Sequence, residues 1–455
     1  MNSMEMVCFV SLLFLFLLRA VGYGINRNKL FRRIFLPSSI TSGLLGLVII
    51  QAFGRFIPPV CTRGWDIYPM VLINVVFAAL FMSFTLPSLS PGNIWKYCGP
   101  QLLYGQVVAW GQYVVGLGLS WFVLAPVFST PPYLGIIIPL GFEGGHGTTA
   151  ALHSTFNALH WEQGADYSFA AATVGIISAL LIGMALINWA VAHGHTKILK
   201  HREDVLFAKD QLTGGDEEGA AAQPFSFQSV RSFVMQLFLV GLAILAGFFL
   251  KKGFLWLVSG IPFPEKKSFF PILPLAPFSI LGSILFSYVL KFYMPSFQVQ
   301  PRTMQRISGM ALDYLIISAV TMLNLKSLVT DFVPFFILVA AVAVWNIFCV
   351  VWLARRLLPD AWFERATVQM GQSMGVTATG LLLLRVVDPR METKALSAFG
   401  YKQLIHEPLM GGGLWPFIAV PLAVVYGPAV VFFISVGVML VWLLVWRVAF
   451  RGRVV

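Results

Sequence analysis

The sequence predicts an all-α polytopic membrane protein. Of its 455 residues, 58% are hydrophobic and 11% are charged, and the mean hydropathy is +0.81. An ordinary soluble domain has about 25% charged residues, so this composition argues against a soluble protein. The net charge of +12 is scattered over loops and forms no patch. We therefore expect a lipid bilayer around the chain and no nucleic-acid partner.

Apolar segments predict about ten transmembrane helices in two halves, because one crossing needs about 20 apolar residues. The first half, residues 1–192, contains expected spans at 5–24, 36–53, 67–86, 101–124 and 166–192. The second half, residues 232–455, contains expected spans at 232–250, 271–292, 308–325, 332–353 and in one long region from 404 to 447. That last region is too long for one upright crossing. A division at Gly411-Gly412-Gly413 or at Tyr426-Gly427-Pro428 gives eleven spans as the alternative.

A polar stretch at 193–231 separates the halves and predicts a flexible linker, because it is too polar to span and rich in glycine. Lysine and arginine favour the cytoplasmic loops of membrane proteins. Counting alternate loops, with residues 354–410 included on the linker side, gives 19 such residues on that side and 7 on the other. We therefore expect a protein of the cytoplasmic (inner) membrane, with its N-terminus outside and the linker in the cytoplasm.

Five spans per half make the second half enter the membrane inverted relative to the first. Each half also contains a glycine-rich polar interruption after its fourth span, from Gly141 to His153 and from Gly371 to Gly380. Paired interruptions are typical of the transport site in carriers with inverted repeats. The sequence thus predicts two inverted five-helix repeats, each with a re-entrant hairpin, at about 132–157 and about 364–388.

The first interruption supplies seven candidate ligands for substrate and ion. Helix N-termini with free N–H groups suit a carboxylate, while freed carbonyls and threonine hydroxyls suit Na⁺. Ionisable groups at membrane depth usually face a cavity. As the alternative, the glycines serve tight helix packing alone and His146 is a structural histidine. The candidates are Glu143, Gly144, Gly145, His146, Gly147, Thr148 and Thr149.

The second interruption supplies oxygens around a glycine, unless its hydroxyls bond back to carbonyls of an ordinary helix. The candidates here are Gly371, Ser373, Gly375, Thr377, Thr379 and Arg385. Arg385 either binds a carboxylate through two hydrogen bonds or anchors its helix at the cytoplasmic surface. Asp313 is a candidate cation or proton site, or else an interfacial residue paired with Arg306. His406 and Glu407 are expected to attach the last span to the second hairpin.

In these interruptions the chain resembles the sodium/glutamate symporter family. The resemblance rests on the GGHGT stretch at 144–148 with Ala150-Ala151, and on Gly371, Gly375, Thr377, Thr379 and Pro408. It implies two inverted five-span domains with re-entrant hairpins, Na⁺-coupled uptake of glutamate, and a homodimer. The departures are Glu143 in place of a small polar residue, Ala378 in place of a proline, an extra Arg385, and the pair His406-Glu407 in a span that is apolar in glutamate carriers.

These observations favour a Na⁺-coupled symporter of glutamate or a related small carboxylate, working by alternating access at a site between the hairpins. Na⁺ is the expected coupling ion, with no organic cofactor. An alternative is a cation/proton exchanger that uses Glu143 and Asp313. A remote alternative is an intramembrane enzyme with Glu143 and His146 as acid and base. No nucleophile or metal-ligand group accompanies those two residues in the sequence, so we expect no enzyme activity.

Overall fold

A computed structural model describes residues 3–28, 36–65, 67–83, 91–201, 205, 227–259, 270–294, 299–325, 329 and 331–450. The regular elements within these ranges are helices, with no strand among them. Nine helical segments of the described chain are long and apolar enough to cross a membrane, and shorter apolar helices accompany them. The prediction of an all-α polytopic membrane protein is confirmed.

Among the described residues, four helices of 16 residues or more precede the interruption in each half. The helices of the first half are α1 (Ser3–Asn26), α3 (Ser38–Phe53), α4 (Tyr68–Ser83), α5 (Pro91–Leu119), α6 (Ala125–Phe128), α7 (Ile137–Phe142), α8 (Gly145–Ala158) and α9 (Gln163–Ala192). Those of the second half are α11 (Phe227–Ser259), α12 (Ala276–Tyr293), α13 (Pro301–Thr321), α15 (Phe332–Phe348), α16 (Ala354–Leu357), α17 (Trp362–Val387), α18 (Ala395–Leu409), α19 (Leu414–Val425) and α20 (Pro428–Phe450).

One local distortion occurs at the same place in both halves. The helix before each interruption, α5 or α15, runs into a π-helical turn, Ser120–Leu124 or Cys349–Leu353, and ends in one further α-helical turn, α6 or α16. The packing repeats as well, because α1 packs on α3 as α11 packs on α12, and α3 packs on α13 as α12 packs on α4. A π turn, which is rare in proteins, thus occurs at the corresponding place in each half.

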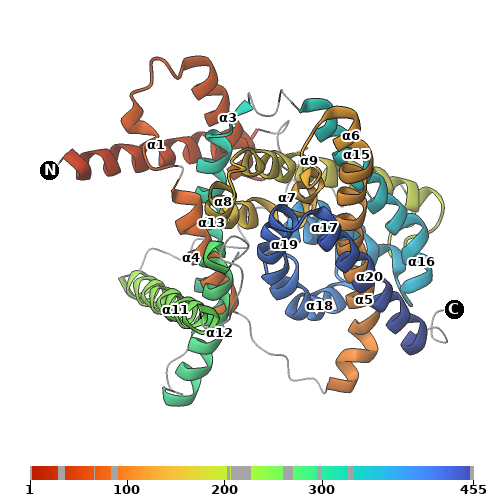
Figure 1. Cartoon of the computed structure of the whole chain (residues 1–455). Coiled ribbons are helices and arrows are strands. Elements are labelled where there is room, and N and C mark those ends of the chain that lie inside the picture. The colour runs from red at the N-terminus through yellow and green to blue at the C-terminus, as the bar shows by residue number, and fades with distance from the viewer. Residues whose placement is uncertain are drawn as a thin grey trace.

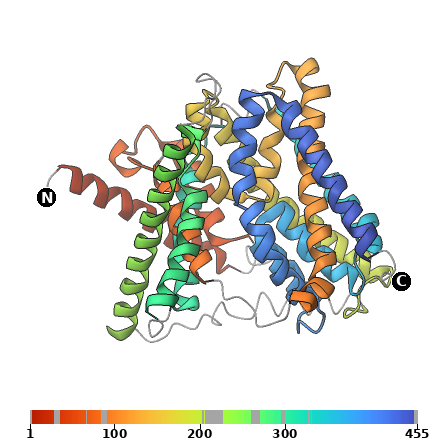
Figure 2. The ribbon, with the colours of Figure 1, turned by 60° about the horizontal axis from the view of Figure 1, so that its bottom comes forward.

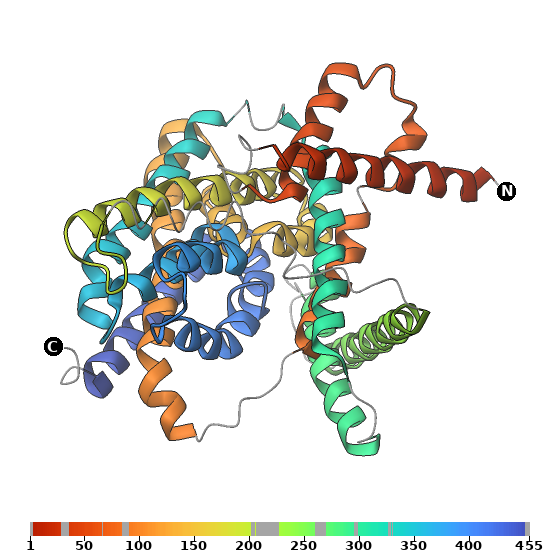
Figure 3. The ribbon, with the colours of Figure 1, turned by 180° about the vertical axis from the view of Figure 1, so that it is seen from behind.

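The helices gather into two bundles (Figures 1 and 2). The first bundle consists of α1, α3, α4, α11, α12 and α13, and the second consists of α5, α7, α8, α9, α15, α17, α18, α19 and α20. Contacts of α4 and α13 with α8 join the two bundles. Seen from behind, α17 and α18 lie next to each other within the second bundle (Figure 3). Both glycine-rich interruptions belong to the second bundle.

The second interruption folds back on itself inside α17. The helix breaks at Gly375 (φ −147°, ψ 31°) and Val376 (φ 62°, ψ 171°). A Cβ atom placed on Gly371 would lie 2.5 Å from the Cα of Gly380, whereas residues nine apart in a continuous helix are about 13 Å apart. The element therefore consists of two antiparallel arms, which pack closely because neither glycine has a side chain.

The first interruption also returns towards its starting point. Tyr133 precedes α7, Trp161 follows α8, and their ring centroids are 4.7 Å apart. The arms are formed by α7 and α8, which pack against each other and both contact α9. The turn between them lies at Glu143 and Gly144.

The C-terminal region differs from the expected single segment at 404–447. Helix formation begins earlier, at Ala395, and two candidate crossings follow, Ala395–Val425 and Pro428–Phe450. They are divided at Gly427, whose φ is +93°. The C-terminal region is therefore divided at Tyr426-Gly427-Pro428, one of the two places that the eleven-span alternative named. Lys402 was counted above among the charges of a cytoplasmic loop, but it lies in α18 and is buried.

The linker expected at 193–231 stays a prediction, because residues 202–204 and 206–226 lie outside the described part of the chain. Its expected last residues belong to α11, which begins at Phe227. Its first residues contact the second bundle, since the backbone N–H of Lys197 donates to Oε1 of Glu364 at 2.5 Å. The described start of the linker is therefore attached to the first arm of α17.

The close crossing of the α17 arms predicts a stability defect in Gly371→Ala. The new methyl group meets backbone rather than a movable side chain, and overpacking of this kind costs about 1–3 kcal/mol. Thermal unfolding of the purified protein should show a clearly lowered midpoint. Gly437→Ala is the matched control, because a Cβ at Gly437 meets nothing within 4 Å, and it should unfold as wild type. Equal midpoints for the two variants would contradict the hairpin.

Candidate functional site

The turns of the two interruptions touch each other. Gly145, at the start of α8, has φ +67°, and a Cβ placed on it would clash with Cγ1 of Val376 at the break of α17. The N-terminus of α8 has no side-chain cap, and the second arm of α17 starts directly after Val376. The first N–H groups of a helix lack intrahelical partners and form the positive end of its dipole. Two such N-termini meet here, which suits a negatively charged group.

A third break in regular helix adjoins this contact. Residues 410–413 separate α18 from α19, and Gly412 has φ +123°. A Cβ placed on Gly412 would come within 3.3 Å of Oγ1 of Thr148 and 2.8 Å of Phe77. Non-helical backbone inside a membrane protein persists where it is buried in protein or lines a wet cavity. Three non-helical segments thus converge within the second bundle, beside α4 of the first.

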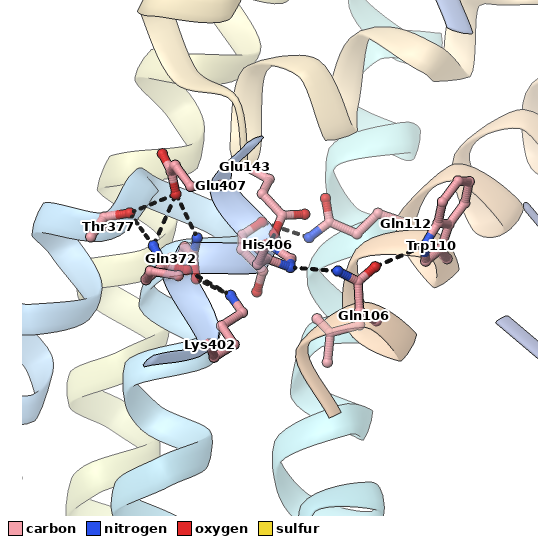
Figure 4. Close-up of polar contacts among 12 residues, drawn as sticks. Gln106, Trp110, Gln112, Glu143, Gln372, Thr377, Lys402, His406 and Glu407 are labelled. Atoms are coloured by element: carbon pink, nitrogen blue, oxygen red, sulfur yellow. Dashed lines mark hydrogen bonds and ion pairs between the residues drawn. The ribbon is translucent and has the colours of Figure 1, made fainter. Parts of the chain in front are cut away.

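A buried acid–histidine pair connects the first interruption to α18 (Figure 4). Nε2 of His406 lies 2.6 Å from Oε1 of Glu143, and the two side chains are 0% and 3% exposed. Nδ1 of His406 lies 3.2 Å from Nε2 of Gln106, whose Oε1 accepts from Nε1 of Trp110 at 2.9 Å. Indole N–H can only donate, which fixes the amide so that it donates to Nδ1. His406 is therefore neutral with its proton on Nε2, and it donates to Glu143.

A second polar group connects α17 to α18, one helical turn away along α18. Nζ of Lys402 donates to Oε1 of Gln372 at 2.5 Å and to Oε1 of Gln403 at 3.0 Å. The amide nitrogens of the same two glutamines donate to Oε2 of Glu407, at 3.4 and 2.9 Å. Thr377, just past the α17 break, donates to the same oxygen at 3.4 Å and accepts from Gln403 at 2.8 Å. Glu407 and Thr377 are partly exposed, so this is the accessible side of the cluster.

The structure brings several predicted site residues together. Glu143, Gly145 and Thr377 lie in the cluster or at the contact between the turns. Gly144 accepts from the Thr148 hydroxyl at 2.9 Å within the turn of the first interruption, and Gly375 lies at the break of α17. Gly147 and Thr149 lie in the first turn of α8, and Gly371 and Thr379 are buried in the two arms of α17.

Other candidates make contacts of a structural kind. His146 bonds to Oγ1 of Thr173 on α9 at 3.0 Å, which is the structural role weighed above. Thr149 bonds back to the carbonyl of Gly145 at 3.1 Å. Ser373 donates to Oδ1 of Asn346 on α15 at 2.7 Å. The bonds of His146 and Ser373 hold the hairpins on α9 and α15, and the Thr149 hydroxyl is engaged within α8.

Two predicted residues lie outside the cluster. Arg385 is exposed near the end of the second arm of α17. Asp313 is on α13 in the first bundle, where it pairs at 2.6 Å with Arg19 of α1, each about 30% exposed. The sequence suggested Arg306 as its partner, and the structure gives Arg19 instead.

Several residues of the cluster were missed from the sequence, above all Gln372, Lys402 and Gln403. Lys402 and Gln403 lie before the expected start of the last span at residue 404, and Gln372 lies among the hydroxyl and glycine candidates of the second interruption. The spacing offers a signal that finds them, because Lys402 and His406, like Gln403 and Glu407, are four apart and share one face of a helix. The sequence predicted that His406 and Glu407 both attach the last span to the second hairpin. In the structure Glu407 bonds to the second hairpin, whereas His406 bonds to the first.

Comparison with known protein families gives one match. Residues 3–390 match the family model described as Sodium/glutamate symporter. This match includes the first bundle, both interruptions and the second bundle as far as α17, and it ends before α18. No curated protein matches the chain.

The buried Glu143–His406 pair predicts strong coupling between the two residues. Glu143→Ala should lower the free energy of unfolding by about 1–3 kcal/mol, because it leaves the imidazole N–H buried without an acceptor. Glu392→Ala is the control, since Glu392 is half exposed and 3.8 Å from Arg390, and it should cost roughly 0–1 kcal/mol. A double-mutant cycle with His406→Ala should show a coupling of at least about 0.5 kcal/mol. Additive effects would show that the pair does not form.

Proposed function

Because the chain belongs to the sodium/glutamate symporter family, we propose that it is a Na⁺-coupled symporter of glutamate or a related small carboxylate. The observation that carries this proposal is the contact between Gly145 and Val376, which sets two helix N-termini against one point inside the protein. A carboxylate bound there accepts from N–H groups that have no partner in their own helices. The family consists of transporters, so no enzymatic role is proposed.

Oxygen atoms for Na⁺ are available at the same place. The Thr377 hydroxyl, the partly exposed Glu407 carboxylate and backbone carbonyls released at the breaks are ligands of the kind that hard cations prefer. Substrate carboxylate and Na⁺ then bind next to each other, so each lowers the cost of desolvating the other. This arrangement couples their transport.

The two hairpins are proposed to be re-entrant and inverted, entering from opposite sides of the membrane. The bond between Lys197 and Glu364 supports this orientation, because it places the base of the second hairpin beside the linker, which positive charges assign to the cytoplasm. The first hairpin then enters from outside, and the N-terminus is also outside. This orientation of the hairpins and of the N-terminus is the one expected for an inner-membrane carrier with inverted repeats.

Alternating access is proposed to come from movement of the second bundle against the first. A cavity of about 400 Å³ lies where α8 faces α4, α11 and α12, and its lining is mostly apolar. It is lined, among others, by Ile73, Asn74, Ala151 and Ser154. Incomplete packing at this interface supports sliding there, because few contacts must be broken.

Reconstituted protein should accumulate radiolabelled glutamate, or a related carboxylate, when Na⁺ is higher outside the liposome. Gly145→Ala should insert and fold but lose at least about tenfold in initial uptake rate, because it separates the hairpin turns. Gly437→Ala is the control and should transport as wild type. Absence of Na⁺-dependent uptake of any amino or dicarboxylic acid by wild type would contradict the proposal.

The exchanger alternative makes a different prediction for Asp313. Exchange through Glu143 and Asp313 needs both carboxylates on the pathway, whereas the structure pairs Asp313 with Arg19 on the half-exposed side of α13. Asp313→Asn should therefore leave Na⁺-driven uptake within about twofold of wild type, as expected for an exposed ion pair. Glu143→Gln should reduce it strongly. An equal loss in both variants, together with Na⁺/H⁺ exchange in the absence of organic substrate, would favour the exchanger.

A further inference from the structure

Lys402 is a fully buried lysine whose charge is not balanced by direct contact with an acid. Its side chain is 1% exposed, and burial of an ammonium inside a membrane protein is costly without compensation. None of the ion pairs between described residues involves Lys402. The compensation comes instead from the two amide oxygens of Gln372 and Gln403, at 2.5 and 3.0 Å.

Those two amides connect the ammonium of Lys402 to a carboxylate on their other side. Each glutamine accepts from Lys402 through its oxygen and donates through its nitrogen to Oε2 of Glu407. The ammonium and the carboxylate are thus separated by one layer of oriented dipoles, supplied by two elements, α17 and α18 (Figure 4). The amide oxygens face the ammonium and the amide nitrogens face the carboxylate. Removal of the ammonium therefore leaves both amide oxygens and the carboxylate without their cation.

A third glutamine adjoins the same position. Gln369 is fully buried, and neither its amide oxygen nor its nitrogen has a hydrogen-bond partner in the part of the chain that the structure describes. A Cβ placed on Gly105 of α5 would come 2.7 Å from Cε of Lys402 and 2.8 Å from Oε1 of Gln369. Lys402 and Gln369 thus both lie against Gly105, whose missing side chain leaves room for them.

Neutral oxygen ligands around a monovalent positive charge, with a carboxylate behind them, are the surroundings of a monovalent cation site. We propose that the ammonium of Lys402 is a covalently attached substitute for a free monovalent cation, and that this position accepts Na⁺ when the lysine is removed. The inference deepens the proposed symport function, because it means that the carrier needs one coupling Na⁺ fewer than the same site would need without Lys402.

Two matched substitutions separate charge from volume at this position. Lys402→Ala removes the charge and opens the space, whereas Lys402→Met removes the charge and fills the space. Thermal unfolding of the purified proteins is measured at constant ionic strength while choline is replaced by Na⁺ or by methylammonium. The midpoint of Lys402→Ala should rise with either cation by about 2 °C or more beyond the rise of wild type, because a cation that binds only the folded state stabilises it. Lys402→Met should show no extra rise.

The double variant Lys402→Ala/Glu407→Gln guards against a folding defect. It leaves no unbalanced charge, so it should fold, and it should show no extra rise because the balancing carboxylate is gone. The proposal is overturned if Lys402→Ala shows no extra rise, if Lys402→Met matches it, or if Lys402→Ala stays unfolded in every cation while the double variant folds. Wild-type uptake tests the symport function separately, so a carrier that fails to take up substrate leaves this measurement valid.

Discussion

The contact between the two helix breaks, at Gly145 and Val376, is the constraint on which the rest of the site depends. It requires that Gly145 has no side chain and that α17 reverses direction beside it. Because the backbone of Gly145 meets the side chain of Val376 directly, the unpaired N–H groups of α8 and of the second α17 arm converge on one position. The remaining parts of the second bundle, including the close crossing of Gly371 and Gly380, keep these two breaks in register.

Burial of several ionisable groups in one place is the second requirement, and α18 meets it by dividing the charges into two groups. Glu143 receives a proton donor from the neutral His406, while Lys402 and Glu407 act on each other through amide dipoles. Direct ion pairs in a low-dielectric interior lose much of their attraction to desolvation. Interposed amides satisfy both charges by hydrogen bonds and leave Glu407 partly exposed inside an otherwise apolar bundle.

Hydropathy and glycine patterns predicted most of the fold, because the bilayer imposes span length and helical hydrogen bonding. The two interruptions were found since glycine clusters are expensive in a helix. The start of α18 was missed because Lys402 and Gln403 lower local hydropathy, and their compensation comes from Gln372, which is distant in sequence. The sequence left open whether Arg385 binds a carboxylate or anchors its helix at the surface, because its position depends on where α17 reverses.

The division between bare hairpin turns and a side-chain-rich α18 also limits how such a carrier can change in evolution. Gly145, Gly371 and Gly380 have no room for even a methyl group, so a larger residue there forces its neighbours apart. Residues 402–407 lie on one helix, but they bond to both hairpins, His406 to Glu143 and both Gln403 and Glu407 to Thr377. A substitution on this face of α18 therefore changes the polar groups beside both turns.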